Sequence, residues 1–129
     1  MAQPADMSID AARAVLHAHI EALNARDERR LSATLHFPHY RLSGTDLKIW
    51  ETPDSYFADF RARAGANWAR SEFSDIREVQ AATDKVHFDV TVNRFDADDQ
   101  LISTFRSLWI ITRENAQWAA KFRSSFAAQ

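Results

Sequence analysis

The hydrophobic residues of this chain change their spacing near Trp68. Before that point most of them recur every three or four positions, which is typical of amphipathic helices. After it the segments VHFDVTV and LISTFRSLWII alternate apolar with polar residues and are rich in β-branched and aromatic side chains, which is typical of strands. Separate helical and strand halves favour an α+β fold, in which helices pack on one side of a curled antiparallel sheet.

The first predicted helix extends from about Ser8 to Ala25. Ser8 is a favourable N-cap residue, and Asp10 places a carboxylate in the first turn, where the helix dipole favours it. Five apolar residues follow at helical spacing and should face the sheet: Ile9, Ala12, Leu16, Ile20 and Leu23. Residues 1–7, which precede the cap, are expected to be flexible.

A short helix and a small hairpin should follow. Asp27 is the N-cap of a helix over residues 27–35, which Pro38 prevents from continuing. A Ser-Gly turn at 43–44 then joins two short extended runs within residues 40–51.

A third helix and the strands complete the chain. The sequence Thr-Pro-Asp at 52–54 supplies N-terminal capping residues, and Gly65 stands where a left-handed C-cap is needed. The breaks DADD and ENAQ divide the remainder into roughly four long antiparallel strands. Residues 1–129 should form one domain, because a chain of this length has room for only one core.

Composition excludes several classes of function. Two glycines cannot supply the closely spaced pairs of Walker loops, dinucleotide-binding loops and nucleophile elbows, so no cofactor is expected. The absence of cysteine removes thiolate nucleophiles and Cys-based metal sites. A net charge of −2 without a long basic run argues against nucleic acid as a partner. Neither a signal peptide nor a run of about 18 apolar residues is present, so we expect no membrane segment and a cytoplasmic location.

Strand pairing brings polar candidates together. A turn at DADD places Asp89 directly opposite Arg106, and a last hairpin at ENAQ places Arg123 beside Arg106 on the same face. This cluster is either a solvent-facing ion pair or part of a site for an anionic or carbonyl-bearing ligand, and a bulge in either strand would exchange the faces. The other face is apolar and aromatic: Val86, Phe88, Val90, Val92, Phe105 and Trp109.

The element order and three segments together resemble the nuclear transport factor 2-like (NTF2-like) superfamily, within it the SnoaL-like or ketosteroid-isomerase-like proteins. The segments are HIEALNARDERRLSATL, GTDLKIWETPDSY and TRENAQWAAKFRSSF. The resemblance spans about residues 8–127 and implies a conical α+β barrel: a bent antiparallel sheet wraps a long helix and leaves a mostly apolar pocket, commonly in a homodimer. Relatives include isomerases, dehydratases, epoxide hydrolases and polyketide cyclases, alongside members that only bind or assemble.

The resemblance also implies where chemistry would lie. The two ketosteroid isomerase acids fall on residues 41–44 and on Leu108, so both are missing, whereas the helix-one tyrosine falls on His19. A histidine at the edge of an apolar stripe is either a hydrogen-bonded core residue or an acid–base group. The family register places Arg106 and Arg123 on the concave, pocket-lining side and leaves the aromatic face for a dimer partner. Burial patterning alone turns the aromatic face toward the helices instead.

Aromatic residues around the third helix are further candidates. Trp50, Tyr56 and Trp68 either fill the core or close the mouth of the pocket. Asp89 and His39 are the remaining predicted pocket residues, although a role in bracing the loop at Pro38 also fits His39. No metal site is expected, because His17 and His19 face opposite sides of a helix.

The sequence therefore predicts a small-molecule pocket protein of the SnoaL-like type that takes a small hydrophobic ligand. One version is a cofactor-independent lyase, isomerase or hydrolase acting on a hydrophobic carbonyl-type substrate, with His19 as acid or base and with Arg106 and Arg123 stabilising oxyanion charge. The alternative is a non-catalytic ligand-binding or dimerisation module. A homodimer is expected in either case.

Overall fold

A computed structural model describes residues 4–63 and 67–126, so the predicted C-cap at Gly65 lies outside the described residues. Within these ranges the chain forms three helices and six strands. Their bounds are α1 Pro4–Ala25, α2 Glu28–Ser32, β1 Leu35–Ser43, β2 Asp46–Trp50, α3 Pro53–Arg63, β3 Arg70–Ala81, β4 Lys85–Phe95, β5 Leu101–Glu114 and β6 Gln117–Ser125. The α+β class predicted from the two hydrophobic periods is confirmed.

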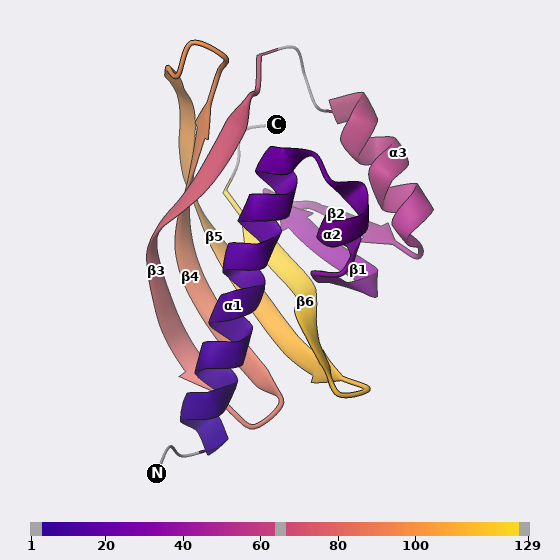
Figure 1. The fold of residues 1–129 in the computed structure, drawn as a ribbon, viewed down its shortest axis with the longest axis vertical. Coiled ribbons are helices and arrows are strands. Elements are labelled where there is room, and N and C mark those ends of the chain that lie inside the picture. The colour runs from indigo at the N-terminus through magenta and orange to yellow at the C-terminus, as the bar shows by residue number, and fades with distance from the viewer. Residues whose placement is uncertain (1–3, 64–66, 127–129) are drawn as a thin grey trace.

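The strands form one curved, open sheet in the order β2-β1-β6-β5-β4-β3 (Figure 1). Neighbouring strands are antiparallel except β1 and β6, which run parallel. The four predicted long strands are present as β3 to β6, but the predicted hairpin, β1 and β2, joins the same sheet. The sheet in the described residues therefore has six strands and is mixed rather than antiparallel. By pairing with β6, β1 satisfies backbone donors and acceptors that would otherwise form an open edge.

Helix α1 lies across the concave face of this sheet (Figure 1). Ala12 and Leu16 on α1 are completely buried, as are Val86 and Phe88 on β4, and Trp109 on β5 is only 3% exposed. The aromatic face of the strands thus packs under α1 and cannot serve a dimer partner, so the burial pattern was the correct guide and the family-derived orientation was wrong. Burial of a large side chain such as Leu16, Val86 or Phe88 contributes about 1.5–3 kcal/mol to the stability of the fold.

Helix α1 begins earlier than predicted. It starts at Pro4, so Ser8 lies inside the helix and is not its N-cap. The Ser8 hydroxyl instead donates a hydrogen bond to the carbonyl oxygen of Thr83 at 2.8 Å, in the turn between β3 and β4. The Ser8 hydroxyl, which the sequence predicted as a helix cap, therefore makes a tertiary contact instead.

Helix α2 is shorter than predicted. Asp27 caps it as expected, because its carboxylate accepts a hydrogen bond from the backbone N–H of Arg30 at 3.1 Å. The helix ends at Ser32, however, and Leu35 already begins β1. Pro38 lies inside β1, where the pairing register with β6 shifts, so its missing N–H interrupts no regular ladder.

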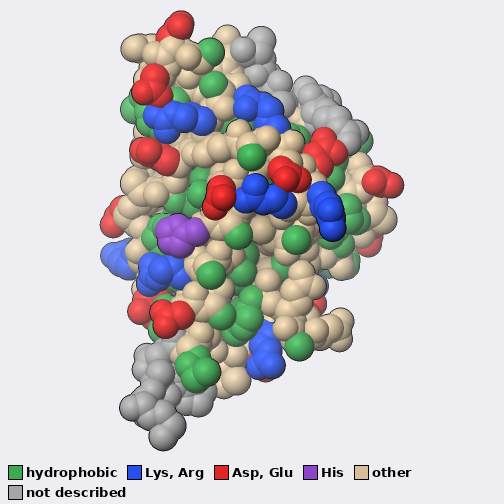
Figure 2. All heavy atoms as spheres, viewed as in Figure 1, with side chains coloured by type: hydrophobic (Ala, Val, Ile, Leu, Met, Phe, Trp, Pro, Cys, Tyr) green, Lys and Arg blue, Asp and Glu red, His purple; other side chains and the backbone are tan. Residues whose placement is uncertain are grey.

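The face of the molecule that carries α1 has mixed charge. Lysine and arginine side chains are interspersed there with aspartates and glutamates (Figure 2). This pattern agrees with the small net charge of −2 and differs from the basic stripe of a nucleic-acid-binding surface. Within the described ranges, none of the helices has both the length and the apolar character that crossing a membrane requires.

Candidate functional site

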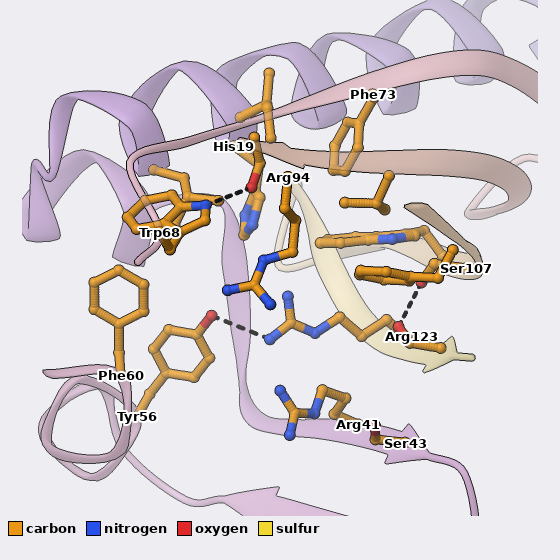
Figure 3. Close-up of a pocket in the computed structure, with 17 residues that line it drawn as sticks. His19, Arg41, Ser43, Tyr56, Phe60, Trp68, Phe73, Arg94, Ser107 and Arg123 are labelled. Atoms are coloured by element: carbon orange, nitrogen blue, oxygen red, sulfur yellow. Dashed lines mark hydrogen bonds between the residues drawn. The ribbon is translucent and has the colours of Figure 1, made fainter. Parts of the chain in front are cut away.

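A cavity of about 390 Å³ lies between α1, α3 and the concave face of the sheet (Figure 3). Small-molecule sites usually have volumes of roughly 300–1,000 Å³, so the space suits one small ligand. Six aromatic rings form much of its wall: Tyr56, Phe60, Trp68, Phe73, Phe105 and Trp109.

Helix α3 brings two of these rings to the cavity. Thr52 caps the helix as predicted, since its hydroxyl oxygen accepts a hydrogen bond from the backbone N–H of Ser55 at 3.2 Å. The first turn then presents Tyr56, which is 2% exposed, and the next turn presents Phe60. Their rings are stacked with centroids 6.5 Å apart. The capping sequence at 52–54 therefore fixes one wall of the cavity.

A bulge in β6 turns Arg123 into the cavity. The pairing of β5 with β6 skips Lys121, which is an extra residue in β6. Because side chains alternate between the two faces, one extra residue exchanges the faces of all residues that follow it. Arg123 consequently pairs with Trp109 on the concave face and does not lie beside Arg106. The predicted last hairpin was wrong in two ways: Trp118 pairs with Arg113 and not with Ile111 as expected, and the bulge then turns Arg123 to the other face.

Arg123 is held among aromatic rings. Its Nη2 donates a hydrogen bond to the Tyr56 hydroxyl oxygen at 3.2 Å (Figure 3). The carbon of its guanidinium lies 5.2 Å from the ring centroid of Trp109 and 5.9 Å from that of Tyr56, within the range of cation–π attraction. Its Nε is buried and has no hydrogen-bond partner within the part of the chain that the structure describes.

Two further arginines line the same cavity, and Figure 3 shows all three guanidinium groups pointing into it. Arg94 extends from the end of β4, and burial lowers the pKa of its guanidinium. Arg41 extends from β1, with the carbon of its guanidinium 5.5 Å from the ring centroid of Trp50. None of the described residues that line the cavity is an aspartate or a glutamate.

His19 lies on the α1 side of the cavity and is 1% exposed. Its Nδ1 is 2.9 Å from the hydroxyl oxygen of Thr34, and that hydroxyl donates its own proton to the carbonyl oxygen of Leu31 at 2.7 Å. Thr34 can therefore only accept from His19, which assigns the imidazole proton to Nδ1. Nε2 is left with a lone pair and is a hydrogen-bond acceptor.

The surroundings of His19 keep it neutral. Burial, and then the nearby charge of Arg123, hold the pKa of His19 well below its ordinary value of 6.5. The ring lies edge-on to Trp109 at 4.9 Å between centroids and is stacked on Phe73 at 6.4 Å. His19 is thus a hydrogen-bonded core residue that also lies in the cavity wall.

The other predicted pocket residues divide between the cavity and the layer behind it. Tyr56 and Trp68 line the cavity. Trp50 and His39 do not, but both pack against Tyr56, with ring centroids 5.1 Å and 6.0 Å away. His39 lies in β1, not in a loop, and its Nδ1 donates to the carbonyl oxygen of Ala120 at 3.0 Å. Burial, followed by the charge of Arg123, lowers the pKa of His39 to about 3.

Arg106 and Asp89 lie on the opposite, convex face of the sheet. Arg106 contacts Asp89 at 2.6 Å and Asp75 at 2.8 Å, and Arg77 contacts Asp89 at 2.9 Å. Hydrogen bonds from Arg106 and Arg77 lower the pKa of Asp89. The predicted ion pair exists, although Asp89 pairs in register with Leu108 and not with Arg106. The prediction that Arg106 and Arg123 share one site was wrong, because the bulge separates them.

Sequence reasoning missed two arginines in the cavity wall. Arg94 lies on the same face of β4 as Val90 and Val92, because every second residue of a strand points the same way. An arginine on a face expected to be buried indicates a cation inside the fold, and the sequence contained this signal. Arg41 stands in the segment that replaces a family catalytic acid. Metal binding has no support in the described residues, where no three His, Asp or Glu side chains converge as ligands.

Comparison with known proteins supports the fold. No protein-family model matches the sequence, and no curated protein matches it either. Solved structures do match: an NTF2-like protein of unknown function from Shewanella oneidensis has a TM-score of 0.75 at 11% identity, over 92% of this chain and 98% of that chain. An NTF2-like protein of unknown function from Pseudomonas putida has a TM-score of 0.72 at 17% identity, over 90% and 83% of the two chains.

A ketosteroid isomerase-like protein from Erwinia carotovora has a TM-score of 0.68 at 13% identity, over 92% of this chain and 96% of that chain. This chain therefore has the NTF2-like fold, and the resemblance stated from the sequence is confirmed at the level of the fold. At these identities the likeness carries no function from one protein to the other.

Proposed function

We propose that this protein binds a small, largely apolar ligand in the cavity, with a carbonyl-type oxygen of the ligand directed at Arg123. The observation that carries the proposal is a space of about 390 Å³ with aromatic walls and a guanidinium group pointing into it. Flat rings on the wall favour a planar ligand, since aromatic pairs stack or meet edge to face. The guanidinium and the hydroxyl of Tyr56 supply the few polar contacts that orient a ligand in such a pocket.

Binding of 2-acetonaphthone, a neutral aromatic ketone, tests the proposal. Isothermal titration calorimetry should detect one saturable site in the unmodified protein. Leu23→Trp places a larger side chain in the cavity wall and should weaken binding about tenfold or more. Leu101→Trp is the matched control, because Leu101 is exposed at the start of β5. Equal loss in both variants would contradict a ligand site in the cavity, and absence of binding would contradict a neutral ketone as its ligand.

A second candidate function is cofactor-independent proton transfer in the same cavity, as in a lyase, isomerase or hydrolase. The free lone pair on His19 Nε2 favours it, because that atom can accept a proton or a hydrogen bond from a ligand. The lowered pKa of His19 makes it a weak base, so ligand binding is the better supported function. His19→Asn keeps a donor for Thr34 and removes Nε2. Turnover of ketone, enone or epoxide substrates that disappears in His19→Asn would favour the enzyme, whereas binding without turnover would favour the binding module.

We also propose a homodimer formed through the convex face of the β2 end of the sheet. Leu47 and Ile49 on β2 are 56% and 49% exposed. Leu47 and Ile49 are two positions apart in one strand, so their side chains lie on the same face. They pair with Leu42 and Tyr40 of β1. That face continues across β6 and β5 through Tyr40, Leu42, Phe122, Leu108 and Ile110. A contiguous apolar surface of this kind is typical of a protein–protein interface.

A further inference from the structure

We propose that the cavity is specific for anions: Arg94 and Arg123 bind the carboxylate of a small aromatic or apolar acid. This inference rests on the proposed function, because it requires that the cavity holds a small molecule. It specifies the chemical class of that molecule, which neither the fold nor the structural neighbours indicate.

Several arginines outside the cavity pair with a carboxylate of the chain, whereas Arg13 and Arg26 lie against aromatic rings. Arg30 contacts Glu21 at 3.0 Å, and Arg70 contacts Asp99 at 2.6 Å. Arg106 contacts Asp89, again at 2.6 Å. Each of these surface guanidinium groups thus has a carboxylate partner from the chain itself.

Arg94 and Arg123 differ from these surface arginines. Within residues 4–63 and 67–126 neither forms an ion pair with a carboxylate, and the cavity wall around them contains no acidic side chain. Withdrawing charged groups from water is costly unless an opposite charge compensates, so the cavity lacks a counter-charge that an anionic ligand would supply.

Hydrogen-bond donors also exceed acceptors in the cavity. The Tyr56 hydroxyl accepts from Arg123, so its own proton is available to a ligand. Within residues 4–63 and 67–126, neither the buried indole Nε1–H of Trp109 nor Arg123 Nε has a hydrogen-bond partner. A ligand rich in acceptors suits these donors, and a carboxylate offers two oxygens with about four acceptor positions.

The geometry of the two groups favours a carboxylate. A guanidinium presents its N–H groups as a planar fork that matches two carboxylate oxygens, and such charge-assisted bonds are roughly twice as strong as neutral ones. Arg94 on β4 and Arg123 on β6 approach from different strands, as Figure 3 shows. The surrounding rings leave the rest of the ligand an apolar environment, which fits an aryl or alkyl acid better than a sugar or a nucleotide.

A matched pair of probes tests the inference. Isothermal titration calorimetry compares 2-naphthoate with 2-naphthamide, which has nearly the same shape and no charge. We expect 2-naphthoate to bind about tenfold or more tightly than 2-naphthamide, with an affinity that falls as salt is added. Equal or tighter binding of 2-naphthamide would overturn the anion inference and leave the proposed ligand site intact. If 2-naphthoate, 2-naphthamide and 2-acetonaphthone all fail to bind, both the inference and the proposed function fail.

Variants assign the effect to the cavity arginines. Arg123→Met and Arg94→Met retain an apolar stem of similar length, and each should weaken 2-naphthoate binding about 10- to 100-fold and 2-naphthamide binding by a clearly smaller factor. Arg106→Met is the matched control, because it removes an arginine from the convex face, and it should leave both affinities unchanged. An equal loss of both probes in the cavity variants, or a loss in Arg106→Met as large as theirs, would overturn the assignment.

Thermal unfolding without ligand provides an independent readout. Arg94→Met removes a partly buried cation that has no carboxylate partner among the described residues, so we expect the melting temperature to rise by a few degrees. A lower melting temperature would show that the chain itself compensates the charge of Arg94, which would overturn the inference for this residue. The two variants are independent, so failure of one to fold leaves the other as a test.

Discussion

His19 and His39 are buried at positions where the folded protein favours the neutral form of the imidazole. Both are enclosed by aromatic rings: His19 lies 4.9 Å from Trp109, and His39 lies 6.1 Å from Trp50 between centroids. Each uses Nδ1 for a buried hydrogen bond, to a hydroxyl for His19 and to a carbonyl for His39. Burial is the largest cause of the lowered pKa in both. These side chains therefore link the packing of the core to pH.

The free energy of unfolding should fall as the pH drops below about 6.5. In the unfolded chain an imidazole takes up a proton near its ordinary pKa of 6.5, whereas the folded pKa of His39 is about 3. The unfolded state thus binds protons that the folded state excludes. The stabilisation from each neutral histidine is fully present above its unfolded pKa and declines by about 1.4 kcal/mol per pH unit as the pH falls toward the folded pKa. Urea titrations at about pH 7.5, 6 and 5 measure this dependence.

Two asparagine variants separate the contribution of His39 from other effects. His39→Asn keeps a donor for the Ala120 carbonyl and should reduce the slope of stability against pH. His17→Asn changes a histidine on the exposed side of α1 and should alter the slope less. A slope that is the same in His39→Asn as in the unmodified protein would contradict a neutral His39 in the folded state.

At the scale of elements, one side chain fastens α1 to the edge of the sheet. Asn24, near the end of α1, donates to the backbone carbonyl of Ser71 and accepts from its backbone N–H, both at 2.8 Å. Ser71 also accepts, through its hydroxyl oxygen, a 2.8 Å hydrogen bond from the indole nitrogen of Trp68. β3 is an edge strand, so these contacts satisfy backbone groups that would otherwise face no partner. The same contacts hold Trp68 in the cavity wall.

Asn24→Ala should lower the free energy of unfolding by about 1–3 kcal/mol, because it leaves two partly buried backbone groups of β3 unsatisfied. Asn24→Asp retains the acceptor and loses the donor, so it should fall between the unmodified protein and Asn24→Ala. Urea denaturation measures all three, and Asn67→Ala, at an exposed position, is the control. Equal stability of Asn24→Ala and Asn67→Ala would show that the contacts with β3 contribute nothing.

At the scale of the whole molecule, the two faces of the sheet have different environments. The concave face is covered by α1 and encloses the cavity, while the convex face carries both the Arg106 ion cluster and the apolar surface that begins at Leu47 and Ile49. The ion cluster is on β3, β4 and β5, and the apolar surface is on the strands toward β2. Charge at one end and apolar side chains at the other would confine a self-association surface to the β2 end.

The proposed dimer should have about twice the chain mass of 14.8 kDa in multi-angle light scattering. Leu47→Lys combined with Ile49→Lys should shift the protein to the monomer mass, because it places charge in the apolar surface. Val79→Lys is the matched control, since Val79 is equally exposed, at 57%, but lies on β3 at the other edge of the sheet. A monomer mass for the unmodified protein, or dissociation by Val79→Lys alone, would exclude this interface.

Interactions between residues close in the sequence were sufficient to predict the fold class and the start of two helices. The change of hydrophobic period predicted the α+β class, and capping residues predicted the starts of α2 and α3, because both signals depend only on neighbours along the chain. The same alternation separated the apolar and polar faces of β4 and β5, with Asp89 and Arg106 on one face. Ser8 is the exception, since its hydroxyl bonds to a residue 75 positions away.

Only the tertiary structure decided which charged side chains share the cavity. One extra residue, Lys121, exchanges the faces of β6, and pairing partners across strands are not encoded by the period of a single strand. The parallel pairing of β1 with β6 likewise joins distant segments, and it is this pairing that brings Arg41 opposite Arg123. Sequence alternation assigned the side chains of β4 and β5 to two faces and indicated that the apolar face packs on the helices. Which side chains from different strands meet on that face depends on strand pairing and on the bulge.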